Sequence, residues 1–441
     1  MRSRRVLRFC CFSLLALMAA CGTKERPIGS VVKGDRLAVM DASQSRIAVG
    51  SEAEVPFAIG RGIVNLSWPQ VGYDVSHAMP NVEASDNPRV VWEASIGDGS
   101  DATHRLLAAP VVSPEAIFVM DAVGRVSARN LNDGEALWSR STTPDGRDDE
   151  AMGGGLALDG DSLYATTGFG DVWAFDAKTG GVLWHRALLK PLRAAPAVAD
   201  RRVFVVSIDN TMTALNAKTG DVLWTHSGIA ESATLMGASS PAVSGDQVMV
   251  AYNSGEIFAL RVQNGRVLWS YSLALPTQVG ALPALADIRG QPVSDRGHLY
   301  AISHGGRFAA IDQTTGERVW EADIGGINTP IVSGTCVFVY GGNGQLAALS
   351  RYSGRALWEV SLPQRSDPDD PDSDPLVWTG PVLIANTLWM VNSAGELVPF
   401  SATDGTRLGT QDLDAPLYIS PVVAARTLYV ITDDGDLKAL R

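Results

Sequence analysis

The chain has 441 residues, a formal net charge of −12, 44 Gly and 19% charged residues. This acidic balance argues against nucleic acid as a partner, because the phosphate backbone is bound by basic surfaces. The Gly content and the lack of a long amphipathic helical pattern are typical of a turn-rich all-β protein.

Residues 1–20 have the pattern of a bacterial export signal. A basic segment at residues 2–8 precedes an apolar run at residues 9–18, which is too short to span a bilayer as a mature helix. The small residues immediately before Cys21 resemble the lipobox of bacterial lipoproteins, with Met18 where Leu is usual. We therefore expect a lipidated Cys21 whose acyl chains anchor the protein. Ordinary signal cleavage beside a coincidental Cys is the alternative.

Lipidation at Cys21 leads to expectations about compartment and redox state. Gly22 rather than Asp follows the Cys, which in lipoproteins favours the outer over the inner membrane. Removing residues 1–20 takes away four Arg and no acid, so the net charge goes from −12 to −16. The signal also contains Cys10 and Cys11, so no disulfide is available, and we expect Cys336 to be a small buried hydrophobe.

Residues 21–89 follow the signal and show no repeat. We expect residues 22–30 to be a flexible tether beyond the lipidated Cys21. The remainder is predicted to be a partly ordered segment that lies on the domain after it and includes Trp68 and His77.

From residue 90 the chain is periodic. A block that opens near a Pro and ends on a Trp 28 positions later occurs eight times with small lapses, and such a period indicates a solenoid, an array or a propeller. The blocks run from Pro110 to Trp138, Leu156 to Trp184, Pro196 to Trp224, Pro241 to Trp269, Pro292 to Trp320, Pro330 to Trp358 and Pro381 to Gly409, and the eighth starts at Pro421.

Each block reads as a four-stranded antiparallel meander. The position 14 residues into the block is a predicted hairpin turn, because it holds only Gly or Asn, the residues that best tolerate a positive φ. Short β-branched and aromatic runs flank it, and a second Gly lies 24 residues into seven blocks. The first set of turn residues is Gly124, Gly170, Asn210, Gly255, Gly306, Gly344, Gly395 and Gly435, and the second is Gly134, Gly180, Gly220, Gly265, Gly316, Gly354 and Gly405.

The two ends of the periodic region complement each other. The eighth block stops after its third strand at residues 437–440, whereas residues 90–93 around Trp92 provide a Trp strand with nothing before it. We therefore predict an eight-bladed β-propeller over residues 90–441, with its last blade closed by the N-terminal strand around Trp92. An open superhelical solenoid is the competing architecture. The Trp residues predicted to pack between blades are Trp92, Trp138, Trp184, Trp224, Trp269, Trp320 and Trp358.

Chemistry-bearing motifs are scarce. The six His are scattered without a pair at metal-ligand spacing, and there is no phosphate-binding Gly loop or nucleophile elbow. The Asp-rich, Pro-interleaved stretch at residues 367–375 lacks the Gly turn and the distal Glu of a calcium loop, which favours a solvated loop. The sequence therefore assigns no catalytic, cofactor-binding or metal-binding residue.

The end of the block resembles a known repeat. Residues 174–184, 214–224 and 310–320 are similar to the tryptophan-docking repeat of quinoprotein dehydrogenases, whereas no Asp follows these Trp, as the Trp-Asp repeat would require. The repeat is shared by enzymes that hold pyrroloquinoline quinone and by the BamB family, lipoproteins of the outer-membrane β-barrel assembly (BAM) machinery. The enzymes carry a vicinal Cys pair and a calcium site, whereas the only vicinal pair here is Cys10-Cys11 in the signal. The resemblance therefore favours the BamB family.

That resemblance implies a non-enzymatic scaffold, with no cofactor besides the acyl chains on Cys21, on the periplasmic face of the outer membrane. Its implied partner is the barrel-forming subunit BamA, held through a POTRA domain, and nascent outer-membrane proteins are a further possibility. In BamB the loops that match those after Trp224 and Trp269 grip the POTRA domain. A periplasmic quinoprotein oxidoreductase and a propeller that binds envelope polymers are the alternatives.

The positions that match the family's contact residues are Leu235, Met236, Asp287 and Arg289. Met236 stands where the family pattern has Arg, and Arg289 where it has Asp. The contact has either been rebuilt with opposite polarity or serves a different partner. The simpler interpretations are that Leu235 and Met236 tuck against the blade, and that Asp287 and Arg289 are a solvated pair.

Overall fold

The computed structural model describes residues 56–441 except 145, 147–151, 232–234, 236 and 275–285. These residues belong to one compact unit spanning residues 45–441. They form strands, turns and loops, so the described part of the chain contains no helix that is long and apolar enough to cross a membrane. The predicted signal and Cys21 lie outside the described residues.

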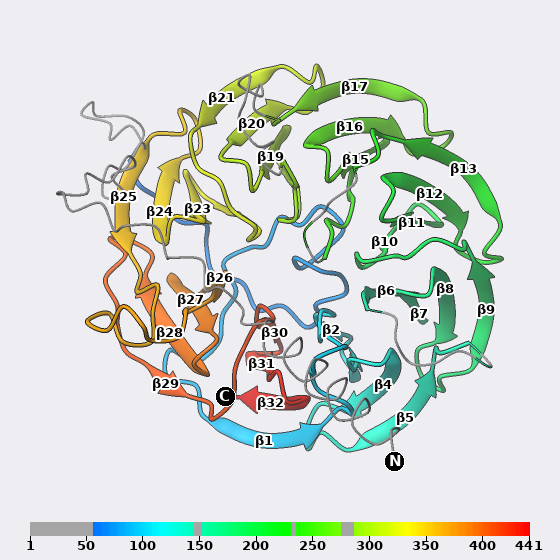
Figure 1. The fold of residues 1–441 in the computed structure, drawn as a ribbon, viewed down its shortest axis with the longest axis horizontal. Coiled ribbons are helices and arrows are strands. Elements are labelled where there is room, and N and C mark those ends of the chain that lie inside the picture. Colours follow the sequence, from blue (N-terminus) through cyan, green and yellow to red (C-terminus); the bar gives the residue numbers. More distant parts are fainter. Residues whose placement is uncertain (1–55, 145, 147–151, 232–234, 236, 275–285) are drawn as a thin grey trace, which may run out of the picture. The chain divides into compact units, whose positions relative to one another are not determined.

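Eight four-stranded antiparallel sheets are arranged around a central axis in chain order (Figure 1). The first strand of each blade lies nearest the axis and the last lies at the rim, which confirms the predicted all-β propeller. The strands of blades 1 to 4 are β2 (Val111–Val112), β3 (Ala116–Met120), β4 (Arg125–Asn130), β5 (Ala136–Ser141); β6 (Gly154–Asp159), β7 (Ser162–Thr167), β8 (Asp171–Asp176), β9 (Val182–Ala187); β10 (Ala197–Ala199), β11 (Arg202–Val206), β12 (Thr211–Asn216), β13 (Val222–Ser227); and β14 (Ala242–Ser244), β15 (Gln247–Ala251), β16 (Glu256–Arg261), β17 (Val267–Ser272). Those of blades 5 to 8 are β18 (Val293–Asp295), β19 (His298–Ile302), β20 (Phe308–Asp312), β21 (Arg318–Ala322); β22 (Ile331–Ser333), β23 (Cys336–Tyr340), β24 (Gln345–Ser350), β25 (Ala356–Ser361); β26 (Trp378–Ile384), β27 (Thr387–Asn392), β28 (Glu396–Ser401), β29 (Gln411–Asp412); and β30 (Val422–Ala424), β31 (Thr427–Ile431), β32 (Asp436–Leu440), β1 (Val90–Ser95).

The ring closes as the sequence predicts. Strand β1 pairs antiparallel with β32, with Trp92 opposite Ala439, and so provides the rim strand of blade 8. Reciprocal backbone hydrogen bonds of 2.7 and 2.9 Å between Arg89 and Arg441 extend this pairing. The propeller is therefore closed between the two ends of its own sequence, which leaves no open edge between blades 8 and 1.

The repeated turn residues have the backbone conformation expected of them. All eight residues of the first set have positive φ, from 58° at Asn210 to 109° at Gly306. The seven glycines of the second set lie between 68° and 76°. Positive φ is the reason for Gly at both positions, because a side chain strains this conformation.

Each blade Trp docks on the second glycine turn of the next blade. The indole Nε1 of Trp138 donates a 2.9 Å hydrogen bond to the carbonyl oxygen of Ala177, and a Cβ on Gly180 would lie 2.6 Å from the Trp138 ring. The same geometry recurs at the Trp–Gly pairs 92–134, 184–220, 224–265, 269–316, 320–354 and 358–405. The glycine therefore allows the turn and also makes room for the neighbouring indole.

A β-bulge precedes each docking Trp in the rim strand. The pairing register shifts between Ala136 and Trp138 in β5, and at the matching place in seven of the eight sheets. Bulges twist an edge strand and discourage pairing with another chain, so these rim edges are protected against edge-to-edge association.

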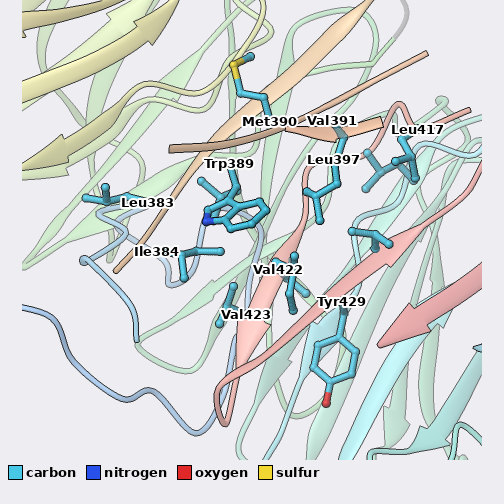
Figure 2. Packing of buried hydrophobic residues seen from close by; sticks show 14 of the residues in the cluster. Leu383, Ile384, Trp389, Met390, Val391, Leu397, Leu417, Val422, Val423 and Tyr429 are labelled. Carbon is cyan, nitrogen blue, oxygen red and sulfur yellow. The ribbon is translucent and has the colours of Figure 1, made fainter. Parts of the chain in front are cut away.

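Blade 7 departs from the pattern for a reason visible in blade 8. Gly409 replaces the Trp, and the rim strand β29 is only two residues long beside Pro399, which has no backbone N–H to donate. In blade 8 the third and fourth strands, β32 and β1, come from opposite ends of the propeller sequence and are not connected by a turn. Blade 8 therefore has no second glycine turn on which an indole from blade 7 could dock. Apolar side chains fill this interface instead (Figure 2), and those shown include Trp389, Leu417 and Tyr429, all nearly fully buried.

Residues 56–85, which we call the strap, cross the middle of the ring and bond to every blade (Figure 1). Trp68 exchanges two 2.8 Å backbone hydrogen bonds with Val112 of β2. Other backbone bonds, and for blade 3 the side chain of Gln70, reach the inner strand or first turn of the other blades. The blade residues bonded in this way are Val112, Leu158, Val198, Val243, Ser294, Thr335, Leu383 and Ala425. The strap therefore closes one face of the ring and ties all eight blades together.

His77 anchors the strap to blade 5. Its side chain is 1% exposed, and its Nδ1 lies 2.8 Å from the carbonyl oxygen of Pro292. Burial lowers the pKa of His77 to about 4, because a buried site disfavours the charged imidazolium. His77 is therefore neutral at pH 7.

Candidate functional site

The face opposite the strap is built from the loops that join each rim strand to the inner strand of the next blade. We call it the open face. Because every blade is a four-stranded antiparallel meander, all these loops emerge at the same end of the ring, together with the turn between the second and third strands of each blade. The loops 228–241 and 273–292 follow β13 and β17, and their described residues Leu235 and Asp287 are in contact on this face.

These two loops are joined by a direct hydrogen bond. The backbone N–H of Leu235 donates to Oδ2 of Asp287 over 2.7 Å, across 52 residues of sequence. Asp287 is 3% exposed, and its own carbonyl oxygen accepts a 2.8 Å bond from the His304 amide. Burial raises the pKa of the Asp287 carboxyl, although the Leu235 amide opposes that shift. Asp287 therefore acts as a brace that fixes the backbone at Leu235, itself half-buried.

The side chain of Arg289 also contacts the loop that follows β13. A Cβ on Gly237 would stand 3.0 Å from the Arg289 Nε, so the guanidinium packs directly on the glycine backbone. Burial lowers the pKa of Arg289, while the nearby Asp287 charge opposes that shift. Because Asp287 is buried, Asp287 and Arg289 are not a solvent-exposed pair. Met236 lies outside the described residues.

Two further apolar side chains on the open face were missed by the sequence analysis. Leu189 is 83% exposed and Ile229 is 61% exposed, in the loops after β9 and β13. Leu189 has a φ of 64°, a left-handed conformation that is strained for Leu. Strain of this kind often marks a functional position. In the sequence, the apolar pair Leu188-Leu189 in a short loop could have indicated this position. Leu188 packs inward, whereas Leu189 is exposed.

A cavity of about 260 Å³ lies on the ring axis and is reached from the open face. All eight blades contribute to its wall through residues at or just before their inner strands, and Val71 of the strap also lines it. The described residues that line it include Arg193 and Arg289, and none of them is Asp or Glu. The cavity is also lined by Leu106, Gln291, Ile327, Asn328, Trp378 and Ile419.

A quinoprotein site would need calcium-binding side chains and a vicinal Cys pair near the axial cavity. Within the described ranges, no three His, Cys, Asp or Glu side chains lie where they could jointly hold a metal ion. Cys336 is a fully buried free thiol in β23 near the strap residue Ala58, so it is not a vicinal pair over a cofactor. The residues lining the axial cavity therefore do not match the calcium and Cys donors of those enzymes.

Comparison with known sequences places these features in a family. The family model described as "Outer membrane protein assembly factor BamB" matches residues 81–152, 146–360 and 342–441, which include all eight blades. The BamB of Yersinia pestis is 27% identical over 348 residues, covering 78% of this chain and 86% of the relative. The BamB of Escherichia coli K12 is 26% identical over 341 residues, covering 76% and 84%.

Solved structures show the same fold. BamB from Moraxella catarrhalis aligns with a TM-score of 0.64 at 21% identity, covering 79% of this chain and 97% of that one. A quinohemoprotein alcohol dehydrogenase from Comamonas testosteroni aligns with a TM-score of 0.65 at 14% identity, covering 85% and 80%. The fold is thus common to both groups, and only the family model and the sequence relatives separate them. By its match across every blade, the chain belongs to the outer membrane protein assembly factor BamB family.

Proposed function

We propose that this protein is a non-enzymatic scaffold of the outer-membrane protein assembly machinery, held by lipid on Cys21 at the periplasmic face of the outer membrane. In this role it docks a POTRA domain of the barrel-forming subunit BamA and assists the insertion of β-barrel proteins. The observation that carries the proposal is the match of the BamB family model to residues 81–441.

The open face supplies the docking surface. Leu235 is held in place by Asp287, Arg289 offers a positive charge beside it, and Leu189 and Ile229 add exposed apolar area. An apolar contact surrounded by polar groups is the usual composition of a protein-binding patch. Leu235, Met236, Asp287 and Arg289 are therefore the proposed contact and positioning residues.

The first described residues of the strap lie on the face of the ring opposite the proposed docking surface. The described chain begins beside blade 6, where the Thr335 hydroxyl donates a 3.0 Å hydrogen bond to the carbonyl oxygen of Pro56. Thr335 lies in the first turn of its blade, on the face opposite the open face. Pro56, the first described residue after Cys21, therefore lies on the strap side of the ring.

Co-purification of BamA from solubilised envelopes tests the docking surface. The double variant Leu235→Asp with Asp287→Ala places a charge at the contact and removes the acceptor of the Leu235 amide, so we expect association to be lost while the ring stays folded. Leu223→Asp is the matched control, because Leu223 is an exposed Leu on the rim strand β13 near the strap side. Undiminished BamA recovery with a folded double variant would remove this surface from consideration.

The non-enzymatic part of the proposal has its own experiment. The purified protein is incubated with pyrroloquinoline quinone and calcium, and dye reduction is measured on alcohols. We expect neither stoichiometric binding of the quinone nor turnover, because the described residues lack the enzymes' donor set. Stoichiometric binding with turnover would instead identify an oxidoreductase.

A further inference from the structure

We propose that the axial cavity is a binding site for a carboxylate-bearing ligand, held by Arg193 and Arg289. This inference goes beyond the scaffold role and does not depend on it. It rests on the presence of two arginines, and of no carboxylate, among the described residues that line a cavity at the centre of an acidic protein.

The two arginines are the first part of the argument. Both line the cavity, and the structure gives neither guanidinium an ion pair or a hydrogen bond to another described residue. The Nε of Arg193 is buried without an acceptor. A half-buried cation without a partner is costly, so the two side chains are suited to an anion that enters from outside.

Arg351 shows how the same fold treats a buried arginine elsewhere. Its side chain is 4% exposed, and it pairs with Asp295, the Tyr300 hydroxyl and the Gly334 carbonyl oxygen. Arg351 is therefore neutralised by its surroundings. The Asp287 charge acts on Arg289, but Asp287 does not line the axial cavity, and none of the described residues that line this cavity is acidic.

Two carboxamides complete the donor set. The Oε1 of Gln291 accepts a 2.6 Å bond from the Ser240 amide, and the Oδ1 of Asn328 accepts a 3.4 Å bond from the Gly380 amide. With both oxygens engaged by backbone N–H groups, each side chain has its NH₂ group left to donate. Two guanidiniums and two NH₂ groups thus form a set of donors, which suits a ligand that only accepts.

A carboxylate meets these requirements. It is acceptor-only when ionised, and its two oxygens match the paired N–H groups of a guanidinium. Apolar wall residues such as Ile327 and Trp378 lower the local dielectric constant, which strengthens the attraction. The volume of about 260 Å³ limits the ligand to a small body. A free dicarboxylate and the C-terminal carboxyl group of a peptide both present this chemistry.

Isothermal titration of the full-length protein tests the proposal and separates the two sources. The probes are succinate, a short apolar peptide with a free C-terminal carboxyl group, and the same peptide as its C-terminal amide. Binding of succinate identifies a free small carboxylate, whereas binding of the peptide acid and not of its amide identifies a chain end. Either result supports the site if Arg193→Gln and Arg289→Gln each weaken binding at least about tenfold, the loss expected for a charge-assisted hydrogen bond.

Arg296→Gln is the matched control, because Arg296 is 68% exposed and lies outside the cavity. It should leave the affinity unchanged, which separates a defined site from a general effect of charge. The proposal is overturned if no probe binds up to about 10 mM, or if the Arg193 and Arg289 variants keep their affinity while remaining folded. Arg193 is not one of the proposed docking residues, so Arg193→Gln should retain BamA, and the two proposals can fail separately.

Discussion

The backbone N–H of Leu235 donates a 2.7 Å hydrogen bond to the buried carboxylate of Asp287, which lies in the next inter-blade loop. A loop has few backbone partners of its own, so an external acceptor restricts the conformations open to it. The brace therefore prepares the Leu235 backbone for contact and reduces the ordering cost of binding. It also accounts for an acid at position 287 of the proposed docking surface that does not face solvent.

Two substitutions at position 287 separate the acceptor from the charge. Asp287→Ala removes the acceptor, so we expect BamA association to weaken and the free energy of unfolding to fall by about 1–3 kcal/mol. Asp287→Asn keeps an oxygen for the Leu235 amide and should preserve most of both quantities. Binding by biolayer interferometry and urea unfolding of each variant check this. Equal losses in the two variants would show that the charge, and not the hydrogen bond, is needed.

The raised pKa of Asp287 adds a pH dependence with a definite sign. A carboxyl whose pKa is higher in the folded than in the unfolded protein contributes stability at low pH, which is lost as the pH rises through the folded value. Above the folded pKa, where the buried carboxyl group is ionised, Asp287 therefore contributes less stability than it does at low pH. Asp287→Asn removes this titration, so the stability of the variant relative to the parent is expected to rise with pH, and urea midpoints of both proteins across the pH range check the sign.

Leu189 offers a test in which stability and association move in opposite directions. Its left-handed φ of 64° costs about 1–2 kcal/mol for an ordinary residue, whereas Asn tolerates it, and its exposed side chain contributes little burial. Leu189→Asn should therefore raise the unfolding free energy by about 1 kcal/mol and weaken BamA binding. The control Leu223→Asn removes an exposed Leu on a rim strand and should change neither. A stabilised variant with unchanged association would exclude Leu189 from the docking surface.

The architecture was predictable because its signals are repeated. A single Gly or Trp is a weak indicator, but the same residue types at fixed spacing in block after block predict the turns, the blades and the closing strand. The pairing of each Trp with the glycine of the following blade was not predicted. It depends on how neighbouring blades approach one another, which the spacing within one block does not describe.

The site was only partly predictable. The loops with Leu235 and Asp287 could be identified through the family resemblance, but the burial of Asp287 depends on the loop folded over it. The strap has no repeat, and its course is set by hydrogen bonds to blades far along the chain. The axial cavity combines residues from eight blades, so no local motif marks Arg193 and Arg289 as neighbours.

The contribution of the Trp–Gly docking to the free energy of unfolding can be measured by comparison with a glycine that has a positive φ but no indole beside it. Gly220→Ala places a Cβ at 2.6 Å from the Trp184 ring in a turn with φ of 70°, whereas Gly160→Ala meets nothing within 4 Å at φ of 56°. We expect the Gly160 variant to lose about 1–2 kcal/mol of unfolding free energy through backbone strain alone. The Gly220 variant should lose more, by a further 1–3 kcal/mol or so for displaced packing. Equal urea midpoints in the two variants would mean that the indole yields without cost.

His77 makes the attachment of the strap sensitive to acid. Its pKa is lowered to about 4 in the folded protein from 6.5, so the unfolded chain binds the proton more readily. Stability is full above pH 6.5 and falls as the pH drops towards 4. At 1.36 kcal/mol for each unit between the two values, the loss at pH 5 relative to pH 7.5 is about 2 kcal/mol. His77→Gln does not titrate and should lose this part of the dependence. Urea unfolding of both proteins from pH 4 to 8 checks the slope, and parallel pH profiles would show that the acid sensitivity arises elsewhere.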